Sequence, residues 1–69
     1  MLNHLTPREL AVLSHMAQGK NNAAIAIELR LSLRVIEKHI NAIFSKLGVS
    51  EEADIHRRVK AVLIYLSQP

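Results

Sequence analysis

Apolar residues recur every three or four positions along most of the chain, which is the spacing of one helix face. The clearest stretch lies between Leu31 and Gly48. Its apolar stripe consists of Ile36, Ile40, Ile43 and Leu47. Ser32 can accept hydrogen bonds from the amides of the first turn, and Gly48 suits the left-handed conformation that ends many helices. We therefore predict a helix over residues 33–47.

A polar row follows the opposite side of this helix. It consists of Arg34, Lys38, Asn41 and Ser45, which are spaced so that they share one face. Every member can donate a hydrogen bond, as side chains that contact phosphates and base edges in a DNA major groove do. Glu37, beside the row, is the exception. From the spacing alone, an ordinary solvated face is the better-supported interpretation, because the outer side of a surface helix is polar in any case.

A helix is also predicted near the N-terminus. Thr6 and Glu9 form a capping-box pattern, and Pro7 suits the first helical position. Gly19 follows the last periodic residue, so we expect this helix over about residues 7–18. Its expected buried side consists of Leu10, Leu13, Met16 and Ala17.

A shorter helix is predicted over about residues 22–29, after a polar joint in which either Asn21 or Asn22 can cap it. Its expected inward positions are Ile25, Ala26 and Leu29. A short helix, a tight turn and a longer two-faced helix form the helix-turn-helix arrangement. The turn lacks the glycine that is often found there, which weakens this local signal.

The last helix is predicted over about residues 55–66, with Ser50 or Asp54 as its cap. Its apolar residues fall on two flanks. The flank expected in the core consists of Ile55, Val59, Val62, Leu63 and Leu66. A helix that is apolar on two sides is either deeply buried or in contact with another chain, so we expect the second flank to meet a partner. This flank consists of Lys60, Ala61, Ile64 and Tyr65. The alternative is that this second flank packs on the domain's own first helix.

The chain has 69 residues, enough for one domain, and we expect residues 1–69 to form a single all-α, four-helix unit. No strand pattern, repeat or low-complexity segment is visible in the sequence. The net charge of +3 is a mild basic bias, which allows nucleic-acid binding without requiring it. No membrane-spanning apolar stretch or signal pattern occurs, so we expect a cytoplasmic location.

Several classes of chemistry lack the residues they need. The chain has no cysteine, and its 4 histidines do not show the spacing of a zinc site. Glycine-rich phosphate loops and catalytic motifs are absent from the sequence, so we expect neither a metal, a cofactor nor enzymatic activity. One Phe, one Tyr and no Trp do not make a stacking platform, so RNA binding ranks below duplex binding.

Several short motifs together resemble the LuxR-type DNA-binding domain of bacterial transcription regulators, also called the FixJ or NarL type. They are Leu5-Thr6-Pro7-Arg8-Glu9, Gly19, Asn22, Ile25-Ala26, Leu29, Ser32, Val35-Ile36-Glu37-Lys38-His39-Ile40 and Lys46-Leu47-Gly48. The similarity runs from Leu5 to about Leu66. It implies a four-helix bundle that binds double-stranded DNA in a sequence-specific way, with the third helix in the major groove and a homodimer through the fourth helix. Such domains usually accompany a receiver or ligand-sensing domain, so this chain is either an isolated output domain or a single-domain regulator.

Carried over position by position, the resemblance implies two sets of DNA contacts. The base-reading set is Arg34, Glu37, Lys38 and Asn41. The phosphate set is Asn22, Ser32, Val35, His39 and Lys46, with Lys20 as a nearby candidate. The family often has Thr at the position of Val35 and Lys at the position of Glu37, and its connector is usually shorter than residues 51–56.

The alternative function is a helical protein–protein interaction module. The apolar flank of the fourth helix would then be the binding surface, and the basic face of the third helix would serve only solubility. Duplex binding that weakens as salt is added distinguishes the two functions, because phosphate contacts release counterions.

Overall fold

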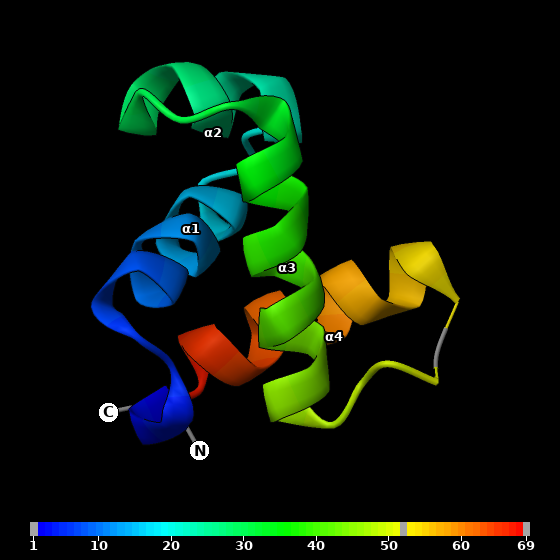
Figure 1. Ribbon diagram of the computed structural model, residues 1–69. Coiled ribbons are helices and arrows are strands. Elements are labelled where there is room, and N and C mark those ends of the chain that lie inside the picture. The colour runs from blue at the N-terminus through cyan, green and yellow to red at the C-terminus, as the bar shows by residue number, and fades with distance from the viewer. Residues whose placement is uncertain (1, 52, 69) are drawn as a thin grey trace.

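The computed structural model consists of four α-helices and a short 3₁₀ helix (Figure 1). It describes residues 2–51 and 53–68, except for the side chains of residues 54 and 55. They are η1 (Leu2–His4), α1 (Pro7–Ala17), α2 (Asn22–Leu29), α3 (Leu33–Leu47) and α4 (Asp54–Leu66). No strand occurs in these residues, and the predicted all-α, helix-turn-helix fold is confirmed. Each predicted α-helix agrees with the observed bounds to within one residue, whereas η1 has no counterpart among the predictions. Over the described ranges, no helix is both long and apolar enough to cross a membrane.

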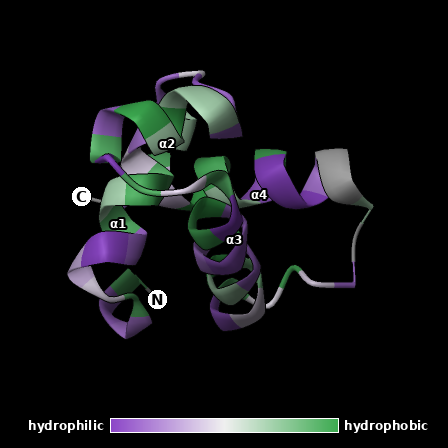
Figure 2. Cartoon of the chain, turned by 45° about the horizontal axis from the view of Figure 1, so that its top comes forward, coloured by the Kyte–Doolittle hydropathy of each residue, from purple (hydrophilic) through white to green (hydrophobic). Residues whose placement is uncertain are grey.

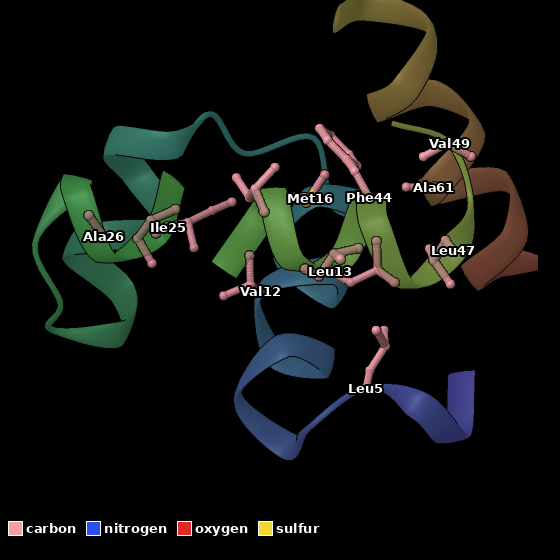
Figure 3. Close-up of a cluster of buried hydrophobic side chains, with 13 residues drawn as sticks. Leu5, Val12, Leu13, Met16, Ile25, Ala26, Phe44, Leu47, Val49 and Ala61 are labelled. Atoms are coloured by element: carbon pink, nitrogen blue, oxygen red, sulfur yellow. The ribbon is translucent and has the colours of Figure 1, made fainter. Parts of the chain in front are cut away.

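The helix α3 lies at the centre of the bundle, with α1 on one side of it and the start of α4 on the other (Figure 1). Its predicted stripe is buried, which confirms that this face anchors the helix. Side chains from the other helices and from the segments beside them surround the stripe (Figure 3). The buried hydrophobic cluster consists of Leu5, Val12, Leu13, Met16, Ile25, Ala26, Ile36, Ile40, Ile43, Phe44, Leu47, Val49 and Ala61.

The predicted caps of the first three α-helices are confirmed. The Thr6 hydroxyl accepts from the Glu9 amide at 3.1 Å, and the Thr6 amide donates to the Glu9 carboxylate at 2.9 Å, which completes the capping box. Asn21, rather than its neighbour, caps α2, because its Oδ1 accepts from the amide of Ala24. Ser32 caps α3. The helix starts follow from local side-chain chemistry.

The predicted cap of α4 is wrong. Ala53 occupies the N-cap position and has no side chain that could accept a hydrogen bond there. Tertiary contacts hold the first turn instead. The guanidinium of Arg57 lies over the ring of Phe44, with 5.2 Å from its carbon to the ring centroid, and donates to the carbonyl of Ser50 at 3.3 Å. The start of this helix is therefore set by its neighbours rather than by a local capping motif.

The buried face of α1 differs from the predicted one. Leu13 and Met16 are buried as expected, but Leu10 and Ala17 are only half-buried. Their places are taken by Val12 and Glu9, which follow helical spacing with the first two; the buried set is Glu9, Val12, Leu13 and Met16. An acidic residue was not expected on the inward face, and its burial is explained by an ion pair described below.

The two flanks of α4 are exchanged relative to the prediction. Ala61, assigned above to a partner, is completely buried, and Ile64 and Tyr65 pack partly buried against the core. The residues left outside are Val59, Leu63 and Leu66, with exposed fractions of 51%, 59% and 62%. The predicted core stripe is therefore wrong at these three positions, whereas Val62 packs partly buried against the core as predicted. The side chain of Ile55, the remaining member of that stripe, lies outside the described residues. The physical reason is close packing, since the small side chain of Ala61 lets α4 approach its neighbours where larger residues would hold it away.

Candidate nucleic-acid interface

The polar row of α3 is fully on the surface. All four of its members are exposed, while the stripe on the other side of the helix is buried; the row is Arg34, Lys38, Asn41 and Ser45. Figure 2 shows the same division, with hydrophilic bands along one side of α3 and hydrophobic bands along the other. Glu37 is also exposed. The structure therefore brings the predicted base-reading residues together on one accessible helix face.

The predicted phosphate contacts near the start of α3 are accessible as well. Ser32 and Val35 are exposed, and His39 is half-buried. The Ser32 hydroxyl accepts from the backbone amide of Val35 at 3.1 Å, so it is engaged as a cap. Where the family often has a threonine, Val35 has no hydroxyl, so its side chain is apolar. Any phosphate contact at this position would have to come from the backbone or from its neighbours.

Asn22 and Lys20, at the joint before α2, make contacts that fix their orientation. The Asn22 Oδ1 accepts from Arg58 at 2.8 Å, which turns its amide nitrogen the other way. The Lys20 ammonium donates to the His15 Nδ1 at 3.0 Å and lies 3.3 Å from the carboxylate of Glu28. Lys20 thus links the end of α1 to α2.

Lys46, which is exposed, is paired with the buried carboxylate of Glu9. The ammonium donates to the Glu9 carboxylate at 2.8 Å, and the residue Glu9 is only 5% exposed. Burial by itself raises the pKa of Glu9, but the hydrogen bonds from Lys46 and from the Thr6 amide, together with the nearby charge of His39, bring the pKa below its ordinary value. Lys46 therefore stabilises the packing of α3 on α1, whatever it contributes to phosphate binding.

Arg58 is a site residue that sequence reasoning missed. Its guanidinium donates to Asn22 and to the backbone carbonyl of Lys20, both at 2.8 Å, and so ties α4 to the joint before α2. Burial lowers the pKa of Arg58. The sequence signal for Arg58 is its position three residues before Ala61, which places both residues on the same helix face. Because the sequence analysis predicts that this face of the helix meets a partner, it does not predict that Arg58 contacts the rest of the domain.

A groove of about 420 Å³ runs between α3 and the start of α4, beside the polar row. We call it the α3–α4 groove. It is lined by Asn22, Glu37, Ile40, Asn41, Phe44, Arg57 and Arg58. Two of the predicted base-reading residues and one predicted phosphate contact thus share it with two arginines of α4.

Residues 3–59 match the family model described as bacterial regulatory proteins of the luxR family. The chain belongs to this family. Its members are DNA-binding transcription regulators of the helix-turn-helix type, which confirms the resemblance found in the motifs. The match includes the whole polar row of α3 and the first turns of α4.

Individual relatives include response regulators. The chain is 45% identical over 47 residues to the transcriptional regulatory protein LiaR of Bacillus subtilis, covering 68% of this chain and 22% of LiaR. It is 39% identical over 64 residues to the nitrate/nitrite response regulator protein NarP of Escherichia coli, covering 93% of this chain and 27% of NarP. The chain therefore spans about a quarter of the length of these relatives. No solved structure gave a significant match.

Proposed function

We propose that this domain binds double-stranded DNA in a sequence-specific way, with α3 lying in the major groove. The observation that carries the proposal is the exposed polar row on α3, set opposite a stripe that is buried in the bundle. A major groove admits an α-helix, and donors along its outer face can reach both phosphates and base edges. The membership of the chain in a family of DNA-binding regulators supports the same arrangement.

Each base-reading residue has a preferred partner by its chemistry. Lys38 would donate to O6 or N7 of guanine, and Asn41 would read adenine or contact a phosphate. Arg34 would serve a base or a phosphate. Glu37 would accept from the amino group of cytosine, since a carboxylate can bind only where a donor is offered.

The phosphate contacts would position the helix rather than read sequence. Asn22, Ser32, Val35 and His39 lie around the row and are the first candidates. Lys20 and Lys46 stay in the proposal with a second role, because both already hold helices together through ion pairs. Contacts of this kind make the affinity for duplex fall as salt is added.

We also propose a homodimer through α4, with a different set of contact residues from the predicted one. The predicted partner flank is largely used by the monomer, because Ala61 is buried and Ile64 and Tyr65 pack on the core. Lys60 is exposed at the edge of this flank. The exposed apolar stripe that a second copy can cover consists of Val59, Leu63 and Leu66. Two copies would read two half-sites related by the symmetry of the pair.

The domain would act as the output part of a regulator in the bacterial cytoplasm. The relatives named above are about four times as long as this chain. NarP is called a response regulator. By analogy, a receiver or sensor domain would control when this domain binds DNA.

The experiment that tests the function is a gel shift with random duplex at several salt concentrations, followed by selection of bound duplexes from a random pool. We expect a shift at low salt that weakens steeply as salt rises, and enrichment of one sequence. No shift at low salt would favour the protein–protein interaction module, for which the exposed apolar stripe of α4 is the supporting observation.

A further inference from the structure

Val35 places a large apolar side chain on the outer face of α3, the side that carries the polar row. Its exposed fraction is 36%, whereas Val12 and Val49 in the core have exposed fractions of 0% and 6%. With a rotation of about 100° per residue, Val35 lies about 60° from Lys38 around the helix axis. Leu33, the other large apolar residue exposed on α3, lies about 140° from Lys38, toward the buried stripe.

The contacts of Val35 leave it without a donor for a phosphate. Its side chain has no hydroxyl, and its backbone amide donates to the Ser32 hydroxyl at 3.1 Å in the cap of α3. Val35 belongs neither to the buried cluster nor to the partly buried residues that pack against it. The residue therefore offers a duplex an apolar surface, and it does so from the first turn of α3. In helix-turn-helix proteins, the N-terminal residues of the helix in the major groove contact base edges.

Thymine is the base that presents an apolar group in the major groove, its C5-methyl. We propose that Val35 reads a thymine by packing its side chain against this methyl group. The inference rests on the proposed function, because it requires α3 to lie in the major groove. It makes Val35 a base-reading residue, in place of the phosphate contact that the family resemblance implied for this position.

The position of Val35 also sets where the thymine lies in the site. Residues three apart on a helix are neighbours on its surface, with about 5–6 Å between their Cβ atoms, so Val35 lies beside Lys38. The thymine is therefore close to the base that Lys38 reads. Burying one carbon of apolar surface stabilises a complex enough to change its affinity about fourfold, which is the effect expected of the methyl contact.

The test removes the methyl group from the DNA and the apolar side chain from the protein. The wild type first selects duplexes from a random pool. Each thymine of the selected site is then replaced in turn by deoxyuridine, which pairs with adenine in the same way but has no C5-methyl group. Fluorescence anisotropy at one fixed salt concentration gives the two affinities. We expect the wild type to lose about fourfold in affinity at one or more of these thymines, and Val35→Ala to lose nothing there.

Leu33→Ala is the matched control. Leu33 is exposed in the same turn of α3 but is directed away from the polar row, so this variant should show the wild-type loss at the same thymine. Each protein is compared with itself on two duplexes, so a change in the stability or the overall affinity of a variant cancels in the ratio. Alanine favours the helix at both positions.

A measurement on the wild type keeps the test independent of the variants. In the complex with the selected duplex, we expect a nuclear Overhauser effect between the methyl protons of Val35 and those of a thymine. The absence of this effect would overturn the inference. So would a selected site without thymine, or a wild type that binds every deoxyuridine duplex as tightly as the original one.

The variants give two further outcomes. An equal loss for Val35→Ala would assign the methyl group to another residue or to DNA shape, and a loss that disappears in Leu33→Ala as well would show that the contact is not specific to Val35. Either result would overturn this inference and leave the proposed function intact. A wild type that binds no duplex at low salt, or that selects no sequence, would overturn the proposed function and this inference with it.

Discussion

The ammonium of Lys46 lies 2.8 Å from the carboxylate of Glu9, and this contact joins the last turn of α3 to the first turn of α1 across 37 positions of sequence. The same carboxylate accepts from the amide of Thr6, so the cap of α1 and the packing of α3 depend on one side chain. The helix α3 is therefore held at its C-terminal end by a charged contact, in addition to its apolar stripe.

Replacing Glu9 by glutamine should destabilise the domain. The variant Glu9→Gln leaves the Lys46 ammonium without its buried carboxylate, and hydrogen bonds to charged groups contribute about 1.5–3 kcal/mol each. We expect a loss of that size in the free energy of unfolding, measured by urea denaturation. The control is Glu51→Gln, an exposed carboxylate on the connector, which should change little. Combining Glu9→Gln with Lys46→Gln should cost less than the sum of the two single changes, and additive costs would contradict a direct coupling.

The ion pair also predicts how stability depends on pH. Although burial raises the pKa of Glu9, the hydrogen bonds from Lys46 and the Thr6 amide leave it below the ordinary value of 4.5. The unfolded chain therefore takes up a proton at Glu9 at a higher pH than the folded chain does. This contribution to stability is complete above pH 4.5 and is lost as the pH falls through the folded pKa. Urea denaturation of the wild type and Glu9→Gln over this range should show their difference shrinking in acid, and a constant difference would contradict the assignment.

The variant Lys38→Ala tests the role of the polar row. Lys38 is exposed and makes no contribution to the core, so the fold should survive. We expect the ratio of affinities for the selected site and a scrambled duplex to fall by the equivalent of about 1–3 kcal/mol, the usual value of a good base contact. Both affinities are measured at one fixed salt concentration, with Arg8→Ala as the control for removing one positive charge. An unchanged ratio would exclude Lys38 as a base-reading residue.

The features that the sequence predicted well are those with local causes. The capping pattern of Thr6 and Glu9 and the cap at Ser32 act within one helical turn, and Gly48 adopts the left-handed conformation that its position indicated. The turn before α3 has no glycine, and another residue in that turn adopts the left-handed conformation instead. Arg30 itself takes the left-handed conformation, with a φ of 57°, at a cost of about 1–2 kcal/mol.

The features that could not be predicted depend on contacts between distant segments. Arg58 reaches residues that lie 36 and 38 positions earlier in the chain, and nothing near it in sequence indicates those partners. The choice between the two apolar flanks of α4 has the same character. Both flanks have helical spacing, and only the fit of Ala61 against the other helices decides which one turns inward.

The exchange of flanks on α4 leads to opposite outcomes for two neighbouring substitutions. Leu63 is exposed on the proposed dimer stripe, so Leu63→Glu should leave the fold intact and weaken self-association, because a carboxylate cannot be buried cheaply against a second copy. Ile64 packs against the core, so Ile64→Glu should lower the free energy of unfolding within the monomer. Analytical ultracentrifugation with a duplex carrying two half-sites measures the first effect, and urea denaturation measures the second. A wild-type monomer–dimer balance for Leu63→Glu, in a protein that has remained folded, would reject this stripe as the dimer contact.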